Sequence, residues 1–431
     1  MILIYTPKIT SRITYITRYI FEDILKVTVE ITDNLDEFKV YQGPKINYSF
    51  EYTDAIRIFP HPFLLKQEVS PVEVEVIRDN GIPLLFPQEG ESDFKFDPFS
   101  AAFYMISRYE EYLIKDRDEH GRFKASSSLA FKHKFNEMPV VNYWADMLKE
   151  CLEYKYPWYV FPPLKFQFIP SIDVDIAYAY RGRSLLRTLA SAAYNIFNIQ
   201  DQIQRWNTLI LGKPDPFDTF GLFREWHKKY TLDTLYFIHV GKYGGHDRCI
   251  SPNNPLMSKL IKEISSEYEV GIHPSYGSNS QLPVIKDEME TLATVSGKSV
   301  SRSRQHFLRF DITKTYPVLI ECGIKEEYSM GWAEMPGFRA GTCTPFNFYN
   351  VNKEEETGLK VYPFTFMDGN WIHYMNSNPD LAVDEIGKLV DTVKKVNGTL
   401  ITIWHNLSIS EIKIWKGWRN IYPTMLTLIT K

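Results

Sequence analysis

The stretch Phe166-Gln-Phe-Ile-Pro-Ser-Ile-Asp-Val-Asp175 decides the fold class that we expect for this chain. Residues 166–172 have the pattern of a buried strand, and two carboxylates follow it. Beyond this stretch the chain alternates apolar strands, expected at 166–172, 234–240, 268–272, 300–308, 361–366 and 399–404, with helices, expected at 217–230, 254–266, 284–296 and 381–396. Such alternation indicates mostly parallel β/α architecture. We therefore expect an α/β protein built around a distorted or incomplete (β/α) barrel.

The chain before this stretch has the pattern of a separate α/β domain. Apolar residues recur at helical steps from Ile13 to Ile24, and residues 27–31 then alternate as in a strand. The segment Tyr156-Pro-Trp-Tyr-Val-Phe-Pro-Pro163 interrupts the periodicity with three prolines. We place the domain boundary there, with an N-terminal α/β domain at 1–160 and the β/α domain at 161–431.

Composition narrows the class of protein. With 431 residues, 44% of them hydrophobic, and a net charge of −4, the chain should form two or three globular domains and has no general surplus of positive charge for nucleic acid. Its cysteines (Cys151, Cys249, Cys322 and Cys343) are too far apart for a zinc knuckle or a disulfide framework. We read no signal peptide and no membrane-spanning run, so we expect a cytoplasmic protein whose only membrane contact would be peripheral.

Two carboxylates, Asp173 and Asp175, follow the strand at 166–172. Residues two apart on a strand point to the same face, so both should project into one site, where one can bind a metal while the other acts as a base. A turn or helix cap is the commoner origin of an isolated Asp-x-Asp pattern.

Histidines and an arginine stand near the ends of later strands. His273 follows the strand at 268–272, His405 closes the strand at 399–404, and Arg304 and His306 should share one face of the strand at 300–308. Each has an ordinary alternative, such as a hydrogen-bonded core histidine for His405. Their coincidence at strand ends, where parallel β/α folds assemble their sites, favours a functional site.

In this order and β/α context, Asp173-Val-Asp175, His273-Pro-Ser-Tyr276, Arg304-Gln-His306-Phe and Trp404-His405-Asn406 resemble the motifs of the polysaccharide deacetylase (NodB-homology) superfamily, over about residues 165–406. The resemblance implies a barrel of that type and a metal-dependent hydrolase that removes acetyl groups from an N-acetylated or O-acetylated sugar in surface-polysaccharide biosynthesis. The implied partner is an acetylated sugar, oligosaccharide or lipid-linked glycan. The N-terminal part resembles the accessory domain of divergent bacterial members.

The resemblance also implies roles for residues. Asp173 matches the catalytic base, Arg304 the arginine that orients it, and His405 the general acid. Asp175 and His273 match metal ligands of a divalent ion, zinc, with cobalt or manganese as alternatives.

The family's second motif carries another histidine where this chain has Gly277, and we take His306 as the replacement ligand. Either Glu327 or Asp368 would stand in for a fourth-motif aspartate. The expected substrate-binding residues are Tyr276, Glu327, Arg339 and Asp368.

Two other readings of function stay open. The absence of a histidine at position 277 fits a catalytically silent relative that binds carbohydrate, and the same scaffold permits hydrolysis of a non-sugar amide.

Two stretches outside these motifs each allow two interpretations. Residues 181–190 form either an ordinary amphipathic helix or one that lies against an anionic membrane, and the glycine-rich loop 241–248 is either a substrate contact or a flexible connection.

Overall fold

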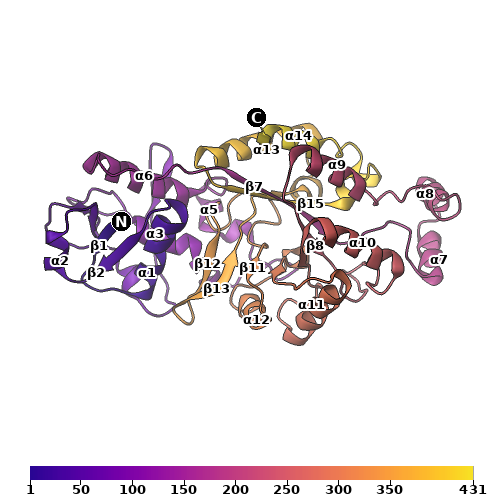
Figure 1. Ribbon diagram of the computed structural model, residues 1–431, viewed down its shortest axis with the longest axis horizontal. Helices are drawn as coiled ribbons and strands as arrows, with labels where there is room; N and C mark the ends of the chain where they lie inside the picture. The colour runs from indigo at the N-terminus through magenta and orange to yellow at the C-terminus, as the bar shows by residue number, and fades with distance from the viewer. Residues whose placement is uncertain (431) are drawn as a thin grey trace.

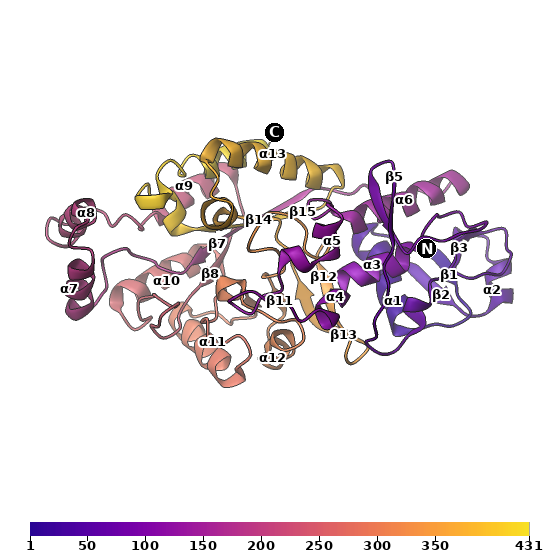
Figure 2. The same ribbon diagram turned by 180° about the vertical axis from the view of Figure 1, so that it is seen from behind.

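The computed structural model describes residues 1–430, and its longest dimension runs from the N-terminal part to two helices, α7 (Leu185–Tyr194) and α8 (Ile199–Leu209), at the opposite end (Figure 1). Between these ends lies a large sheet in which the strand expected at 166–172 is the third from one edge. Seen from behind, the same arrangement places the sheet between helix α13 on one side and α11 and α12 on the other (Figure 2).

The N-terminal part contains a parallel sheet in the order β2-β1-β3-β4. Its strands are β1 (Ile2–Tyr5), β2 (Val29–Thr32), β3 (Lys45–Asn47) and β4 (Ile56–Arg57). Helix α1 (Ser11–Arg18) starts at Thr10, whose hydroxyl accepts the backbone N–H of Ile13, and runs on as a π-helix, η1 (Tyr19–Ile24). The apolar residues that predicted this helix, among them Ile13 and Ile20, are fully buried.

The remaining elements of the N-terminal part include both helices and strands. They are α2 (Leu35–Val40), η2 (Pro62–Leu65), the antiparallel pair β5 (Val76–Asp79) and β6 (Ile82–Leu85), α3 (Pro98–Ile106), α4 (Tyr109–Leu113), η3 (Ala125–Ser127), α5 (Leu129–Lys132) and α6 (Val140–Lys155). Helices α3 and α4 are separate, because Arg108 between them takes a left-handed backbone conformation with φ 53°.

The second sheet has the order β12-β13-β11-β10-β9-β8-β7-β15-β14 within residues 1–430. Its strands are β7 (Gln167–Val174), β8 (Leu235–Ile238), β9 (Glu269–Ile272), β10 (Arg302–Ser303), β11 (Glu326–Glu327), β12 (Phe346–Asn350), β13 (Glu355–Val361), β14 (Phe366–Met367) and β15 (Thr399–His405). Neighbouring strands pair in parallel except β12 with β13. The mixed α/β class with parallel sheets is thus confirmed, while the incomplete barrel stays a prediction.

Helices link the strands of this sheet. They are α9 (Phe220–Tyr230), α10 (Pro255–Glu267), α11 (Leu282–Ser296), α12 (Thr315–Glu321), α13 (Pro379–Lys395) and α14 (Ile421–Thr430), with short η4 (His306–Leu308), η5 (Asn370–Tyr374), η6 (Asn406–Ile409) and η7 (Lys413–Trp415). The strand expected over 300–308 is wrong in extent. It ends at Ser303, because Phe307 (φ 61°) and Leu308 (φ 52°) have left-handed backbone conformations that no strand accommodates.

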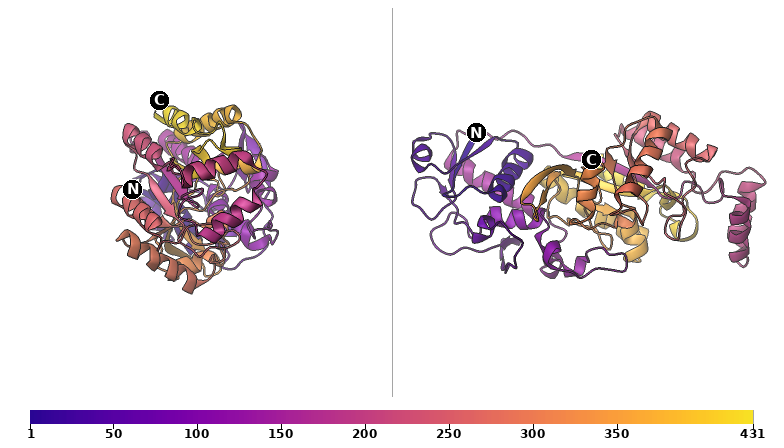
Figure 3. Two further views of the ribbon diagram at one scale, coloured as in Figure 1. Left: turned by 90° about the vertical axis from the view of Figure 1, so that its right-hand side faces the viewer. Right: turned by 90° about the horizontal axis from the view of Figure 1, so that it is seen from below.

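The N-terminal part and the large sheet share one continuous core. Tyr15 of α1 packs against Tyr349 of β12 with the ring centroids 4.9 Å apart and the ring planes tilted by 42°, and its hydroxyl donates to the backbone oxygen of Asn347. Figure 3 shows the N-terminal part against the large sheet and α7 with α8 standing away from it. The domain boundary near residue 160 remains a proposal. No helix in residues 1–430 is both long and apolar enough to cross a bilayer.

Candidate functional site

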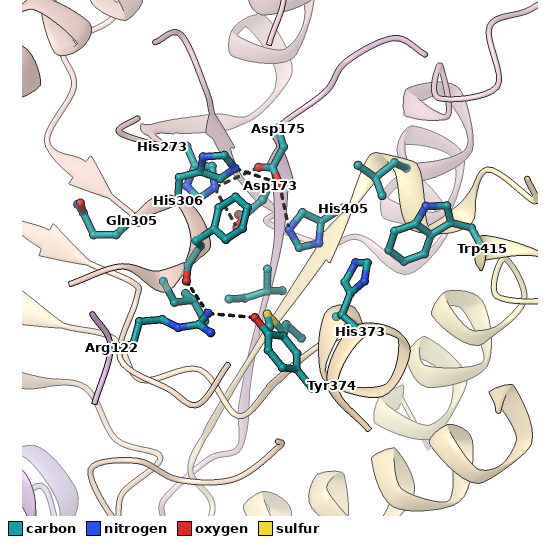
Figure 4. Close-up of a pocket in the computed structure, with 16 residues that line it drawn as sticks. Arg122, Asp173, Asp175, His273, Gln305, His306, His373, Tyr374, His405 and Trp415 are labelled. Carbon is teal, nitrogen blue, oxygen red and sulfur yellow. Dashed lines mark hydrogen bonds and ion pairs between the residues drawn. The ribbon is translucent and has the colours of Figure 1, made fainter. Parts of the chain in front are cut away.

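The carboxyl ends of adjacent parallel strands bring the sequence-predicted residues together (Figure 4). Asp173 lies in β7 opposite His405 of β15, and Asp175 follows β7 directly. His273 follows β9, and His306 begins η4 after β10. They surround a cavity of about 170 Å³, the central cavity, whose other walls include Arg122, Phe307, Leu308, Met367, Tyr374, Ile403, Leu407 and Trp415.

Asp175 is the point on which three imidazoles converge. Its Oδ1 lies 3.1 Å from Nε2 of His273, and its Oδ2 lies 3.6 Å from Nε2 of His306 and 3.6 Å from Nε2 of His405. Among the described residues, Oδ1 of Asp175 is buried without a hydrogen-bond partner. Asp175, His273 and His306 each offer a ligand atom within 4.8 Å of the other two.

The far side of each ring decides which nitrogen carries its proton. Nδ1 of His273 meets the backbone oxygen of Arg304 at 2.5 Å, and Nδ1 of His306 meets Oδ1 of Asp247 at 2.9 Å. A carbonyl and a carboxylate only accept, so both Nδ1 atoms must donate. In the neutral rings, Nε2 therefore turns a lone pair towards the Asp175 carboxylate. Lone pairs facing a carboxylate repel unless a positive charge lies between them.

This donor set fits a divalent metal ion. Two imidazole nitrogens and one carboxylate are the ligands of many open zinc sites, and the far ring N–H of such a histidine is commonly held by a carbonyl or carboxylate. The orphaned oxygen of Asp175 and the inward lone pairs of His273 and His306 supply what such an ion requires. His306 thus lies beside Asp175 and His273, as expected for a third ligand, whereas Gly277 is exposed.

Charge at this centre favours a cation. Burial disfavours the ionised form of Asp175, yet the rings of His306 and His405 hold the pKa of its carboxyl well below the usual range. Burial likewise opposes protonation of His306, but Asp175 and Asp247 raise its pKa. A proton and a metal ion bind to the same Nε2 lone pair. The negative charges of Asp175 and Asp247 that favour protonation of His306 therefore also favour a metal cation at this place.

His405 has a different support from the other rings. Its Nδ1 donates to Oδ1 of Asp368 at 2.7 Å, and Ser408 donates to the second oxygen of Asp368. Burial lowers the pKa of His405, but Asp368 and Asp175 together raise it to about 10. Asp368, expected to bind substrate, is fully buried behind this ring and does not line the central cavity.

Arg304 holds Asp173 in place from within the sheet. The guanidinium is fully buried, and its Nη1 donates to Oδ1 of Asp173 at 2.7 Å and to the hydroxyl of Ser171 at 2.8 Å. Its Nε donates to the backbone oxygen of Tyr328 at 3.0 Å. Arg304 and His306 thus reach the site although the strand that was expected to present both ends before them. Oδ2 of Asp173 lies 3.8 Å from Nε2 of His273.

Sequence reasoning missed two residues behind the metal-type cluster. Asp247 accepts from Nδ1 of His306 and from the backbone N–H of Tyr276 (2.9 Å each), and lies 3.3 Å from Nε2 of the buried His239. His239 in turn donates from Nδ1 to the backbone oxygen of His273 at 2.9 Å. His239 could have been found from its place at the end of the strand expected over 234–240. Asp247 sits in a loop where no periodicity signals it.

The N-terminal part also contributes to the wall of the central cavity. Arg122 donates from Nη1 to the backbone oxygen of Phe307 at 2.9 Å and to the hydroxyl of Tyr374 at 3.0 Å. Its Nε is held by Asp118 at 2.6 Å. The role of this part was left open by the sequence, and Arg122 shows that it shapes the site.

Like Asp368, the other three expected substrate-binding residues do not line the central cavity. Glu327 is fully buried and accepts from the hydroxyl of Tyr316 at 2.9 Å. Arg339 is buried and makes two bonds to Glu111, of 2.9 and 2.7 Å. The hydroxyl of Tyr276 is hydrogen-bonded to a ring nitrogen of His120 at 3.0 Å. These side chains are satisfied within the protein, so we no longer assign them to substrate.

Comparison of the sequence with protein families matches residues 2–157 to a family of unknown function (DUF7033). A search of curated proteins found no match.

Solved structures similar to this chain include polysaccharide deacetylases. A protein from Mycobacterium smegmatis described as a polysaccharide deacetylase is 12% identical, with 63% of this chain and 85% of that chain covered and a TM-score of 0.41. A polysaccharide deacetylase from Bacillus cereus is 14% identical (62% and 88% covered, TM-score 0.30), and a CE4 family pseudoenzyme from Bacillus anthracis is 12% identical (62% and 62%, TM-score 0.32). Because all three TM-scores are below 0.5, the proposal that follows is built on the geometry of the site and on the sequence motifs.

Proposed function

We propose that this protein is a metal-dependent hydrolase that removes an acetyl group from an N-acetylated or O-acetylated sugar. The observation that carries the proposal is the convergence of the Nε2 atoms of His273, His306 and His405 on Asp175, next to an Asp173 that Arg304 fixes. The resemblance of these motifs to polysaccharide deacetylases supports the choice of substrate class.

Asp175, His273 and His306 would hold the metal ion, with zinc as our first choice and cobalt or manganese as alternatives. When bound, a divalent ion at this place supplies Lewis acidity towards the acyl carbonyl and the attacking water. The remaining chemistry falls to residues of the chain.

Asp173 would accept the proton of the attacking water. Arg304 occupies its Oδ1, which leaves Oδ2 as the basic atom beside the cavity. The Nε2 of His405 is placed to return a proton to the leaving nitrogen or oxygen, because Asp368 holds the opposite side of the ring. In the overall reaction, one water hydrolyses one amide or ester, and the products are acetate and a free amine or alcohol.

The walls of the cavity suit a small acyl group. Leu308, Ile403 and Trp415 line it together with the titratable cluster. An acetyl group has the matching division, with an apolar methyl on one side and a polar carbonyl on the other.

The test combines acetate release with metal analysis. Purified protein equilibrated with zinc should release acetate from N-acetylated chitooligosaccharides or acetylated xylan. Asp173→Asn should abolish release while retaining the metal, and His306→Ala should lose the metal. His133→Ala changes an exposed histidine and should behave as wild type.

Other outcomes identify the competing functions. A protein that binds no zinc, cobalt or manganese but retains glycans on an affinity gel would be a silent carbohydrate-binding relative. A metal-loaded protein that cleaves only non-sugar acetamides would be an amide hydrolase on the same scaffold. Unchanged acetate release by Asp173→Asn would remove the mechanism.

A further inference from the structure

The helical pair α7–α8 turns its apolar side outward. Of the 28 large hydrophobic side chains that are exposed in the described residues, 12 lie between Leu185 and Leu211. Leu186 is 81% exposed and Phe197 is 97% exposed. The pair stands away from the rest of the molecule, at the end opposite the N-terminal part (Figures 1 and 3). Such a concentration of exposed apolar side chains marks an interaction surface.

The polar side chains of the pair face inward, which inverts the usual pattern of a helix in water. On α8, Asp201 and Arg205 are 2% and 1% exposed, and they form an ion pair of 2.8 Å. Asp201 also accepts from the hydroxyl of Tyr180 at 3.0 Å and pairs with Lys413 at 2.9 Å. Gln202 donates to the backbone of α7 at 2.7 Å. These contacts fix the pair to the body and leave the apolar side to face something other than water.

The surroundings of the pair are cationic. Residues 181–213 contain five lysines and arginines but one carboxylate, Asp201, in a chain whose net charge is −4. A cavity of about 890 Å³ between α7, α8 and the body has five cationic side chains in its lining, those of Arg183, Arg187, Arg205, Arg248 and Lys413, and one carboxylate, Asp201, which pairs with Arg205 and Lys413. We call it the cationic cavity. Positive charge around an apolar helical surface complements a bilayer that carries anionic lipid headgroups.

We propose that α7–α8 docks on an anionic lipid bilayer, with its apolar side in the interface and the cationic cavity towards the headgroups. An interfacial helix needs an apolar side and flanking cations, and α7–α8 has both. Its outward side includes Leu185, Leu186 and Leu189 of α7 and Ile199 and Ile203 of α8. A second copy of this chain would bury the same side chains but would bring like charges together.

Docking at this place would present the proposed active site to substrates held at the membrane. The segment that follows β7 serves both cavities, because Asp175 lines the central cavity and Ala179 and Tyr180 line the cationic one. Near the C-terminus, Trp415 lines the central cavity and Lys413 lines the cationic cavity. Both cavities therefore lie at the carboxyl end of β7.

The docking is tested with sedimented vesicles, which require no enzymatic activity. The full chain should bind vesicles of phosphatidylcholine mixed with phosphatidylglycerol and bind pure phosphatidylcholine far more weakly, and added salt should release it. Leu186→Asp with Phe197→Asp should abolish binding. Arg183→Ser and Arg187→Ser should each weaken it by about fivefold.

The control changes two equally exposed apolar residues elsewhere. Tyr154 and Val160 are 90% and 83% exposed, and Tyr154→Asp with Val160→Asp should bind vesicles as wild type does. Circular dichroism verifies that each variant is folded. Equal binding by the α7–α8 variant and the wild type would overturn the proposal. The absence of vesicle binding at low salt would also overturn the proposal. If, in addition, light scattering showed a wild-type dimer that the α7–α8 variant converts to a monomer, the apolar side would be a contact between two copies of the chain.

Discussion

Replacing Asp247 with asparagine should weaken the binding of zinc although Asp247 is not one of the proposed ligands. Oδ1 of Asp247 accepts from Nδ1 of His306, which sets the ring so that Nε2 faces Asp175. Asparagine keeps the size and one oxygen of the side chain but removes the negative charge that makes the ring a stronger donor to a cation. The change therefore tests whether Asp247 positions and polarises His306.

The expected magnitude follows from the contacts. Loss of a carboxylate behind a ligating histidine costs about 10- to 100-fold in metal affinity, or about 1.4–2.7 kcal/mol. We expect the upper part of this range, because the same oxygen also lies 3.3 Å from Nε2 of His239 and accepts from the backbone N–H of Tyr276 at 2.9 Å. An amide cannot serve these three neighbours at once.

The assay is competition for zinc against a fluorescent chelator, with the apparent dissociation constant compared between variants. Glu288→Gln is the matched control. Glu288 is another buried carboxylate nearby, and its Oε2 accepts from the backbone N–H of Ser275 at 2.9 Å, a bond that glutamine can retain. The control should bind zinc as wild type does.

Two results would contradict this role of Asp247. If Asp247→Asn bound zinc as tightly as wild type, His306 would need no carboxylate support or would not be a ligand. If Glu288→Gln weakened binding as much as Asp247→Asn, the effect would be a general consequence of removing negative charge rather than of the contact to His306.

Three further predictions concern catalysis and stability. Arg304→Lys should lower kcat for acetate release by about 100-fold with zinc content unchanged, because lysine cannot keep the bond to Asp173 together with the two bonds, to Ser171 and to the backbone of Tyr328, that orient the guanidinium; a wild-type rate would contradict this. His405→Gln should lower amide hydrolysis by about 10²- to 10⁴-fold yet leave 4-nitrophenyl acetate hydrolysis much less affected, since that leaving group needs no acid; equal losses on both substrates would argue against an acid role. Burial opposes ionisation of Glu111, but Arg339 and Arg108 lower its pKa from 4.5 to about 2, so this group contributes about 3 kcal/mol of stability above pH 4.5 that is lost as the pH falls towards 2. Urea unfolding should show that Glu111→Gln destabilises the protein near pH 7 and that the difference from wild type shrinks on acidification; a difference independent of pH would exclude the ion pair as its cause.

The sequence predicted which residues of the cluster lie together only for those residues whose position is set by a regular strand. Asp173, His273 and His405 stand at or just beyond the ends of adjacent parallel strands, and such ends share one edge of a sheet. His306 was expected at the site because it would share one face of a strand with Arg304, and this reason was wrong. The strand that was to present it ends at Ser303, and a left-handed turn at Phe307 follows. Its neighbour Arg304 also lies beyond that strand, but still within extended chain.

The polar residues assigned to substrate show the opposite limit. Glu327, Arg339 and Asp368 are charged residue types that often bind substrates, but each is buried and hydrogen-bonded to other side chains of the protein. A single sequence contains no record of which distant side chain will meet a buried carboxylate. Asp247 lies in the loop 241–248, which the sequence offered only as a substrate contact or a flexible connection, because its partner His306 is 59 residues away along the chain.

By itself, the amino-acid sequence determined the alternation of strands and helices, and with it the edge of the sheet where titratable residues would gather, since both follow from local periodicity. The tertiary structure alone decided which ring nitrogens face Asp175, which carboxylates stand behind those rings, and that α7–α8 turns its apolar side outward. These features depend on contacts between residues distant along the chain, and hydrogen-bond partners over such distances are set by packing rather than by any local pattern.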